Sequence, residues 1–250
     1  ALALARSYAA ANPGDDMAQF LFAVTLDLAG QGAEARGLLE KLTTESPTLL
    51  QPWLALYGSV LRGEAGTDPA AAREAAHQVL VRAAAALPGE SKLQILLAGD
   101  HEQRGDAEAA LAIYEKLYAA DSNDLIVANN YASLLATERS DPESLEQAYT
   151  VARRLRGLDQ PAFQDTYGWI AFRRGDIDAA ATDLAKAAAG LPNDPSVQYH
   201  LGRALAAQDR PEEARVQYER AKILIDQAGV RYERLGPELD QAIAELPAVN

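Results

Sequence analysis

The sequence predicts an all-α protein, a solenoid of stacked antiparallel helix pairs, and three observations lead to this prediction. Alanine-rich amphipathic segments end at a fixed interval, and such a period in the thirties is typical of helical hairpins that pack only on their neighbours. Gly-Asp pairs recur midway between these ends, at Gly105-Asp106 and Gly175-Asp176. Hydrophobic residues make up 48% of the 250 residues, with alanine, the best helix former, prominent among them. The interval is 34 residues in three pairs of segment ends: Pro13 and Pro47, Pro88 and Ser122, and Pro192 and Asp226.

The predicted elements follow one another along the whole chain, which we expect to form one domain over 1–250. Residues 1–15 are expected to form the second helix of a truncated repeat. Residues 227–250 are expected to form a C-terminal capping helix with an apolar stripe that includes Tyr232 and Leu239, interrupted at Gly236-Pro237. Six full repeats are predicted between these ends: 16–49, 50–90, 91–124, 125–160, 161–194 and 195–226.

Two of the repeats are longer than the period. The second runs 41 residues from Pro47 to Pro88, with its extra residues near 63–68, and the fourth has four or five extra residues near 137–141. After each insertion an aspartate precedes a proline, which predicts an N-cap followed by a residue tolerated in the first turn of a helix. The same pair opens the sixth repeat, so three helix starts are predicted from it: Asp68-Pro69, Asp141-Pro142 and Asp194-Pro195.

The repeats share a pattern of residue types. In the fifth repeat the slots hold Tyr167-Gly168, Ala171, Gly175-Asp176, Ala180, Leu184, Ala187 and Pro192, and the sixth has Leu201-Gly202, Leu205, Ala214, Tyr218 and Ala221. This pattern resembles the tetratricopeptide repeat family. The resemblance implies a right-handed superhelix, and it places six aromatic residues in the packing core: Tyr8, Trp53, Tyr114, Tyr131, Tyr167 and Tyr218.

The resemblance also implies a concave groove, lined by first-helix residues, that binds a segment of a partner protein. We expect Trp169, Tyr199 and Arg203 to contribute most, because these residue types are enriched at binding hot spots. An alternative is that Trp169 packs against the neighbouring helix, and Gly58 and Gly99 mark either close approach of a ligand or tight helix contact. The lysine and asparagine pair of a carboxylate clamp is missing. The predicted lining consists of Phe20, Val24, Leu54, Ile95, Asn129, Ser133, Asp165, Trp169, Phe172, Arg173, Tyr199 and Arg203.

Composition and motifs exclude several other functions. The net charge of −13 disfavours binding to nucleic acid or an anionic membrane, and no apolar stretch approaches the roughly 20 residues that span a bilayer. The absence of cysteine excludes thiol catalysis and cysteine zinc sites, and the histidines His77, His101 and His200 lie far apart in the predicted ladder. No phosphate loop, dinucleotide fingerprint or nucleophile elbow is present. We therefore expect no enzyme activity, no cofactor and no metal, and we expect the arginines of 153–156 on a solvated outer face.

The sequence thus predicts a non-enzymatic protein-binding scaffold that holds an extended or helical segment. Two alternatives stay open: a substrate-presenting arm of a larger enzyme such as a glycosyltransferase, and a structural scaffold that self-associates through its repeat ends. The stretches 129–131 and 165–176 also resemble repeats of bacterial exopolysaccharide-export proteins, which implies an envelope or periplasmic location, with the cytoplasm as the alternative. Because the chain starts without methionine or a signal peptide, we expect it to be a piece of a longer protein.

Overall fold

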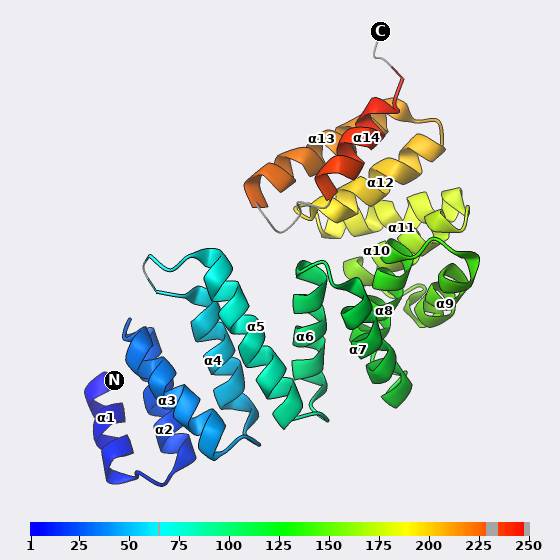
Figure 1. Ribbon diagram of the computed structural model, residues 1–250. Helices are drawn as coiled ribbons and strands as arrows, with labels where there is room; N and C mark the ends of the chain where they lie inside the picture. Colours follow the sequence, from blue (N-terminus) through cyan, green and yellow to red (C-terminus); the bar gives the residue numbers. More distant parts are fainter. Residues whose placement is uncertain (65, 229–234, 248–250) are drawn as a thin grey trace. The chain divides into compact units, whose positions relative to one another are not determined.

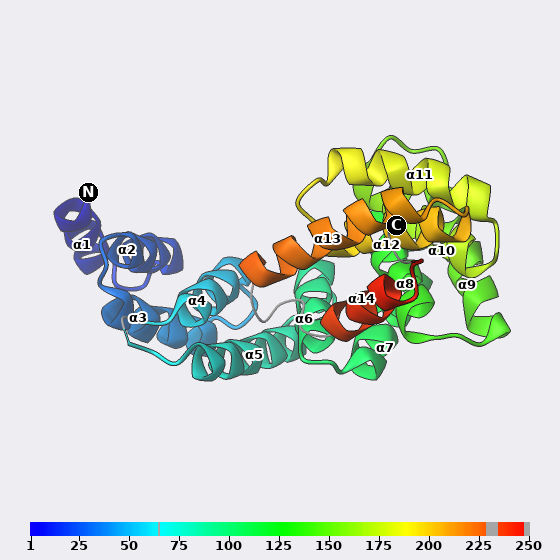
Figure 2. The same cartoon turned by 90° about the horizontal axis from the view of Figure 1, so that it is seen from above.

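The computed structural model describes residues 1–64, 66–228 and 235–247, and every regular element in them is helical (Figures 1 and 2). The predicted all-α fold class is confirmed. Contacts divide the chain into two compact units, Ala1–Arg104 and Gly105–Asn250, and the third predicted repeat, 91–124, contributes its first helix to one unit and its second to the other. One domain over 1–250 stays a prediction.

The first unit is a series of helices, each packed on the next (Figure 1). Leu26 and Ala35 belong to one buried cluster. Trp53, Leu56 and Leu93 belong to a second, which joins successive helix pairs. Its helices are α1 (Leu2–Ala11), α2 (Asp16–Leu28), α3 (Gly32–Glu45), α4 (Leu50–Arg62), α5 (Pro69–Ala86) and α6 (Ser91–Gln103).

The second unit consists of α7 (Ala107–Ala120), α8 (Leu125–Glu138), α9 (Pro142–Ala152), the short 3-10 helix η1 (Arg153–Leu155), α10 (Pro161–Arg173), α11 (Ile177–Gly190), α12 (Pro195–Ala207), α13 (Pro211–Ala228) and α14 (Leu235–Ala244). The helices α8, α10, α12 and α14 pack one on the next, and we call them the inner layer. The helices α9, α11 and α13 pack chiefly on the inner layer rather than on one another. Because the inner helices are the more closely spaced, the stack curves with the inner layer on its concave side.

The helix starts predicted from Asp-Pro pairs are confirmed. The carboxylate of Asp68 accepts hydrogen bonds from the first backbone N–H groups of α5, and that of Asp194 does the same for α12. At α9 the carboxylate of Asp141 accepts from the Ser144 N–H at 2.9 Å. The first predicted insertion follows the end of α4 at Arg62 and precedes α5. The second, predicted near 137–141, lies only in part between helices, because α8 continues to Glu138.

In several helix pairs a residue with a left-handed backbone conformation follows the first helix. Gly30, Gly105 and Gly175 have φ between 78° and 90°, and this conformation closes the helix with little steric cost because glycine lacks a Cβ. In the sixth repeat the same turn uses Asp209, with φ of 59°. A non-glycine residue there carries backbone strain.

Polar side chains form a ladder between successive pairs. In each rung an acidic residue near the start of a second helix binds a side chain at the end of the next first helix. The charged rungs are Glu74–Arg104, Glu108–Arg139 and Glu146–Arg174, and the fourth is a hydrogen bond from Gln208 to Asp178 at 2.8 Å. Exposed pairs of this kind each stabilise by about 0–1 kcal/mol, so their main effect is on the register between repeats.

Several expectations about single residues need correction. Tyr8 was expected in the core but is 52% exposed, because α1 turns Ala9, not Tyr8, towards α2. In the 153–156 cluster Arg154 is half-buried, with its guanidinium 5.1 Å from the ring centroid of Tyr118, so this arginine is not simply solvated. Tyr167 is only partly buried, whereas the other four predicted core aromatics are buried.

The end of the chain carries the predicted cap. α14 packs on α12 and α13 and buries Leu239. Gly236-Pro237 does not interrupt this helix, because the proline lies in its first turn, where the missing N–H has no partner to lose. Tyr232, which the cap stripe included, lies outside the described residues.

Candidate partner-binding site

The two inner helices α10 and α12 bring together an aromatic cluster from two stretches of chain about 30 residues apart in the sequence. The indole of Trp169 stacks on the ring of His200 at a centroid distance of 4.1 Å, and on the ring of Phe172 at 5.1 Å. Tyr199 approaches the same indole at 6.2 Å. Stacked and tilted rings at these distances stabilise by about 0.5–1.5 kcal/mol per pair beyond their buried area, so the cluster ties α10 to α12.

Arg203 supplies the positive charge of this cluster. Its guanidinium donates a hydrogen bond to the Tyr199 hydroxyl at 2.9 Å and lies over the Phe172 ring at 5.6 Å. Burial raises the pKa of the Tyr199 phenol, while the Arg203 charge opposes that rise. The phenol is therefore neutral at pH 7, and the guanidinium keeps further N–H donors for other acceptors.

The structure buries Trp169 and Tyr199, two of the four aromatic residues that were expected to line the groove. Trp169 is 7% exposed and Tyr199 is 3% exposed, so neighbouring side chains of the same unit cover them. This arrangement agrees with the alternative interpretation, in which Trp169 packs against the adjacent helix. Whether the cluster also contacts a partner stays a prediction.

The Trp169 indole nonetheless keeps an unused hydrogen-bond donor. Its Nε1 is buried and has no acceptor among the described residues. The other tryptophan differs, because the Nε1 of Trp53 donates to the Pro47 carbonyl at 2.9 Å. A buried polar group without a partner costs about 1–3 kcal/mol, and buried tryptophans usually avoid that cost.

The remaining lining residues of α10 are engaged within the chain. Asp165 binds Nδ1 of His200 at 2.9 Å, which fixes the imidazole under the indole. Arg173 donates to the backbone carbonyls of Ala136 and Arg139, the latter at 3.1 Å. These carbonyls are at the end of α8, where the C=O groups of the last turn have no intrahelical N–H donors, so Arg173 caps a neighbouring helix.

The inner helix α8 carries the other two predicted lining residues of this unit, Asn129 and Ser133, both half-buried. The Asn129 amide donates to Asn130, but its Oδ1 is buried and has no hydrogen-bond donor among the described residues. An orphan acceptor on α8 and an orphan donor on α10 thus lie on neighbouring inner helices. The sequence placed both residues in the predicted lining, but only the structure shows that these two atoms have no partner.

The predicted lining residues of the first unit are half-buried and form no aromatic cluster like that of α10 and α12 among the described residues. Phe20 and Leu54 are half-buried against the Trp53 cluster, and Val24 and Ile95 are half-buried too. A Cβ placed on Gly99 would meet nothing within 4 Å, and one on Gly58 would meet only the Arg62 side chain at 3.4 Å. Tight helix contact is therefore the wrong interpretation of both glycines.

The histidines are not as far apart as the repeat order suggested. The rings of His77 and His101 meet edge to face at 5.5 Å, and His77 Nδ1 lies 2.6 Å from Asp100. Consecutive helices α5 and α6 bring them together. Even so, in the described part of the chain no group of three or more His, Cys, Asp or Glu side chains is arranged to hold a metal ion.

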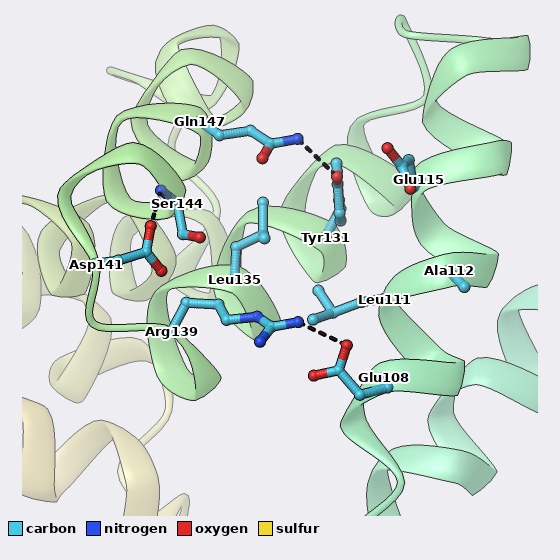
Figure 3. Close-up of a pocket in the computed structure, with 10 residues that line it drawn as sticks. All are labelled: Glu108, Leu111, Ala112, Glu115, Tyr131, Leu135, Arg139, Asp141, Ser144 and Gln147. Atoms are coloured by element: carbon cyan, nitrogen blue, oxygen red, sulfur yellow. Dashed lines mark hydrogen bonds and ion pairs between the residues drawn. The ribbon is translucent and has the colours of Figure 1, made fainter.

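A second surface, which the sequence did not predict, lies beside α8 (Figure 3). It is a cavity of about 300 Å³ between α7 and α9, with α8 as its floor. Its lining consists of Glu108, Leu111, Ala112, Glu115, Tyr131, Leu135, Arg139, Asp141, Ser144 and Gln147. Tyr131 and Leu135 are two residues on from Asn129 and Ser133, about 200° around the helix, so one helix serves both surfaces.

Comparison with known proteins gives a family match for one segment of the chain. A family model described as tetratricopeptide repeat matches residues 168–228, and no curated protein matches the chain at a significant level. The match covers the rings of the aromatic cluster, the end of α10, and α11, α12 and α13. The resemblance that the sequence pattern showed is thereby confirmed over residues 168–228.

Solved structures support the same fold over the rest of the chain. The crystal structure of the Cut9–Hcn1 hetero-tetramer of the APC/C matches 96% of this chain with a TM-score of 0.63 at 14% identity, and this chain spans 45% of that one. PilF of Pseudomonas aeruginosa matches 89% of this chain and 97% of its own, with a TM-score of 0.58 at 14% identity. A TPR protein of Thermus thermophilus matches 78% of this chain and 96% of its own, with a TM-score of 0.53 at 22% identity. The α-solenoid class is confirmed.

Tetratricopeptide arrays generally bind protein or peptide partners and typically have no catalytic role. Within the described residues, no helix is both long enough and apolar enough to cross a bilayer.

Proposed function

We propose that this chain is a non-enzymatic scaffold that binds a segment of a partner protein along the inner layer of its second unit. The observation that carries the proposal is the pair of orphan polar atoms, Trp169 Nε1 and Asn129 Oδ1, on adjacent inner helices. A peptide backbone supplies one acceptor and one donor per residue, which is the complement these atoms lack. Arg203 extends the same surface with its remaining N–H donors.

Occupation of the groove requires side-chain movements. The two orphan atoms are buried in the free chain, so a partner segment reaches them only when the side chains that cover them shift. Each orphan atom that gains a hydrogen-bond partner in the complex no longer carries the cost of about 1–3 kcal/mol for a buried unpaired group, which favours binding. This gain offsets part of the entropy lost when the partner segment becomes ordered.

Site-specific photocrosslinking tests the proposal. A benzophenone side chain at Ser133 on the inner layer, and a matched one at the exposed Ala185 on α11, are introduced into the full chain and irradiated in cells of the source organism. We expect an adduct with another protein from position 133 and none from position 185. Adducts from position 185 alone, or only between copies of this chain, would contradict the proposal and favour the self-associating scaffold.

The cellular location of the chain and the nature of its parent protein are tested separately. We propose an envelope or periplasmic role, supported by the resemblance of 129–131 and 165–176 to exopolysaccharide-export repeats. Fractionation of source cells with an antibody to this chain tests it, and recovery in the cytoplasmic fraction would refute it. The full-length gene decides the alternative of an enzyme arm, since a catalytic domain attached to the repeats would favour that alternative.

A further inference from the structure

We propose that the cavity between α7, α8 and α9 binds a basic side chain, arginine or lysine, together with the adjoining backbone of an extended partner segment (Figure 3). The cavity uses a different face of α8 from the one that carries the predicted groove residues Asn129 and Ser133.

The floor of the cavity suits the methylene stem of a long side chain. Leu111, Tyr131 and Leu135 are all buried, and Tyr131 is only 4% exposed. On the α7 side of the cavity the short side chain of Ala112 lies between the longer side chains of Leu111 and Glu115 (Figure 3). Lysine and arginine commonly lay their stems along apolar surface while the charged end reaches a polar rim.

The rim is acidic. Three carboxylates, Glu108, Glu115 and Asp141, face one guanidinium, that of Arg139. Arg139 already binds Glu108 at 2.6 Å, and Asp141 accepts the Ser144 N–H that starts α9. Hydrogen bonding to Ser144 lowers the pKa of Asp141, so its carboxylate is ionised at neutral pH.

Glu115 is the carboxylate that has no counter-charge. Among the described residues it forms no ion pair, and it stands on the face of α7 that turns towards Tyr131 (Figure 3). Burial raises the pKa of the Tyr131 phenol, and the Glu115 charge raises it further. The negative charge of Glu115 therefore acts on the floor of the cavity, and a cation bound there neutralises this charge.

Tyr131 adds a directional contact. Its hydroxyl accepts a hydrogen bond from the Gln147 amide at 2.8 Å, and no acceptor for its own proton is found among the described residues. The buried Tyr131 side chain lines the cavity, with its hydroxyl beside the Gln147 amide (Figure 3). A backbone carbonyl next to the basic residue supplies the missing acceptor, which favours a protein segment. A second copy of this chain is a poor occupant, because each copy carries a net charge of −13.

Two blocked tripeptides that differ only in charge test the inference. Acetyl-Gly-Arg-Gly-amide and its citrulline counterpart are titrated into the isotope-labelled full chain, and amide shifts are followed by NMR. We expect the arginine peptide to shift residues of 108–115 and 131–147, and to bind at least about tenfold more tightly than the neutral peptide.

Two variants make the test specific. Glu115→Gln should weaken the arginine peptide about tenfold, whereas Glu219→Gln on α13, which removes the same charge from an exposed site, should leave its affinity unchanged. Equal binding of both peptides would overturn the inference, as would shifts confined to α10 and α12 or equal effects of the two variants.

Discussion

The Gly202→Ala substitution probes the closest approach between the two helices of a repeat. A Cβ at this position would lie 2.3 Å from Cε1 and 2.5 Å from Cδ1 of Tyr218, whose ring is buried between α12 and α13. Carbon atoms pack best at about 3.5–4.0 Å, so the ring or a helix must move by more than about 1 Å. Overpacking of this kind costs about 1–3 kcal/mol, and the large overlap indicates the upper end of that range.

The higher helix propensity of alanine opposes this loss of stability, and a glycine with free space around it therefore provides the control. Replacing a helical glycine with alanine stabilises the helix by about 1 kcal/mol where space allows. Gly99→Ala meets nothing within 4 Å and should show this gain. Gly202→Ala should instead lose about 2 kcal/mol, the overpacking cost less the propensity gain, so one chemical change has opposite signs at two sites.

Hydrogen exchange measured by mass spectrometry suits this comparison, because each repeat of an array contacts mainly its neighbours and opens locally. Peptides from α12 and α13 should exchange faster in Gly202→Ala, while peptides from α2 and α3 should keep their rates. Adding Tyr218→Leu should remove most of the penalty from the added methyl group. A Gly202→Ala variant as stable as the parent chain, or more stable, would refute the reasoning.

Three further predictions concern single contacts. Asp209→Gly should raise the free energy of unfolding by about 1 kcal/mol by removing left-handed strain, whereas Gly175→Ala in the equivalent turn should lower it similarly; opposite shifts of the urea midpoints would contradict this. Burial raises the pKa of Tyr218 well above its usual value, so the folded chain holds that proton while the unfolded chain loses it. Stability should therefore fall by up to about 1.4 kcal/mol per pH unit above about pH 10, and urea melts of Tyr218→Phe should show a shallower fall. Arg173→Ala should speed amide exchange in the last turn of α8, whose carbonyls it binds, and unchanged exchange there would rule out the capping role.

The sequence by itself determined the architecture, because the residues that start, end and pair the two helices of a repeat all lie within that repeat. The 34-residue spacing, the Asp-Pro starts and the left-handed glycines all act within a few residues of the chain. Gly202 is predictable in the same way, since its slot faces the second helix of its own repeat. Local signals of this kind do not depend on how one repeat is placed on the next.

Contacts between repeats were decided by the tertiary structure alone. The stack of Trp169 on His200 and the capping of α8 by Arg173 join residues from different repeats, so they depend on the packing between helices as well as on the period. The cavity floored by Tyr131 likewise needs three helices from two repeats. Sequence periodicity shows which face of a helix is buried, but only the packed structure shows which neighbour covers it and which polar atoms are left without a partner.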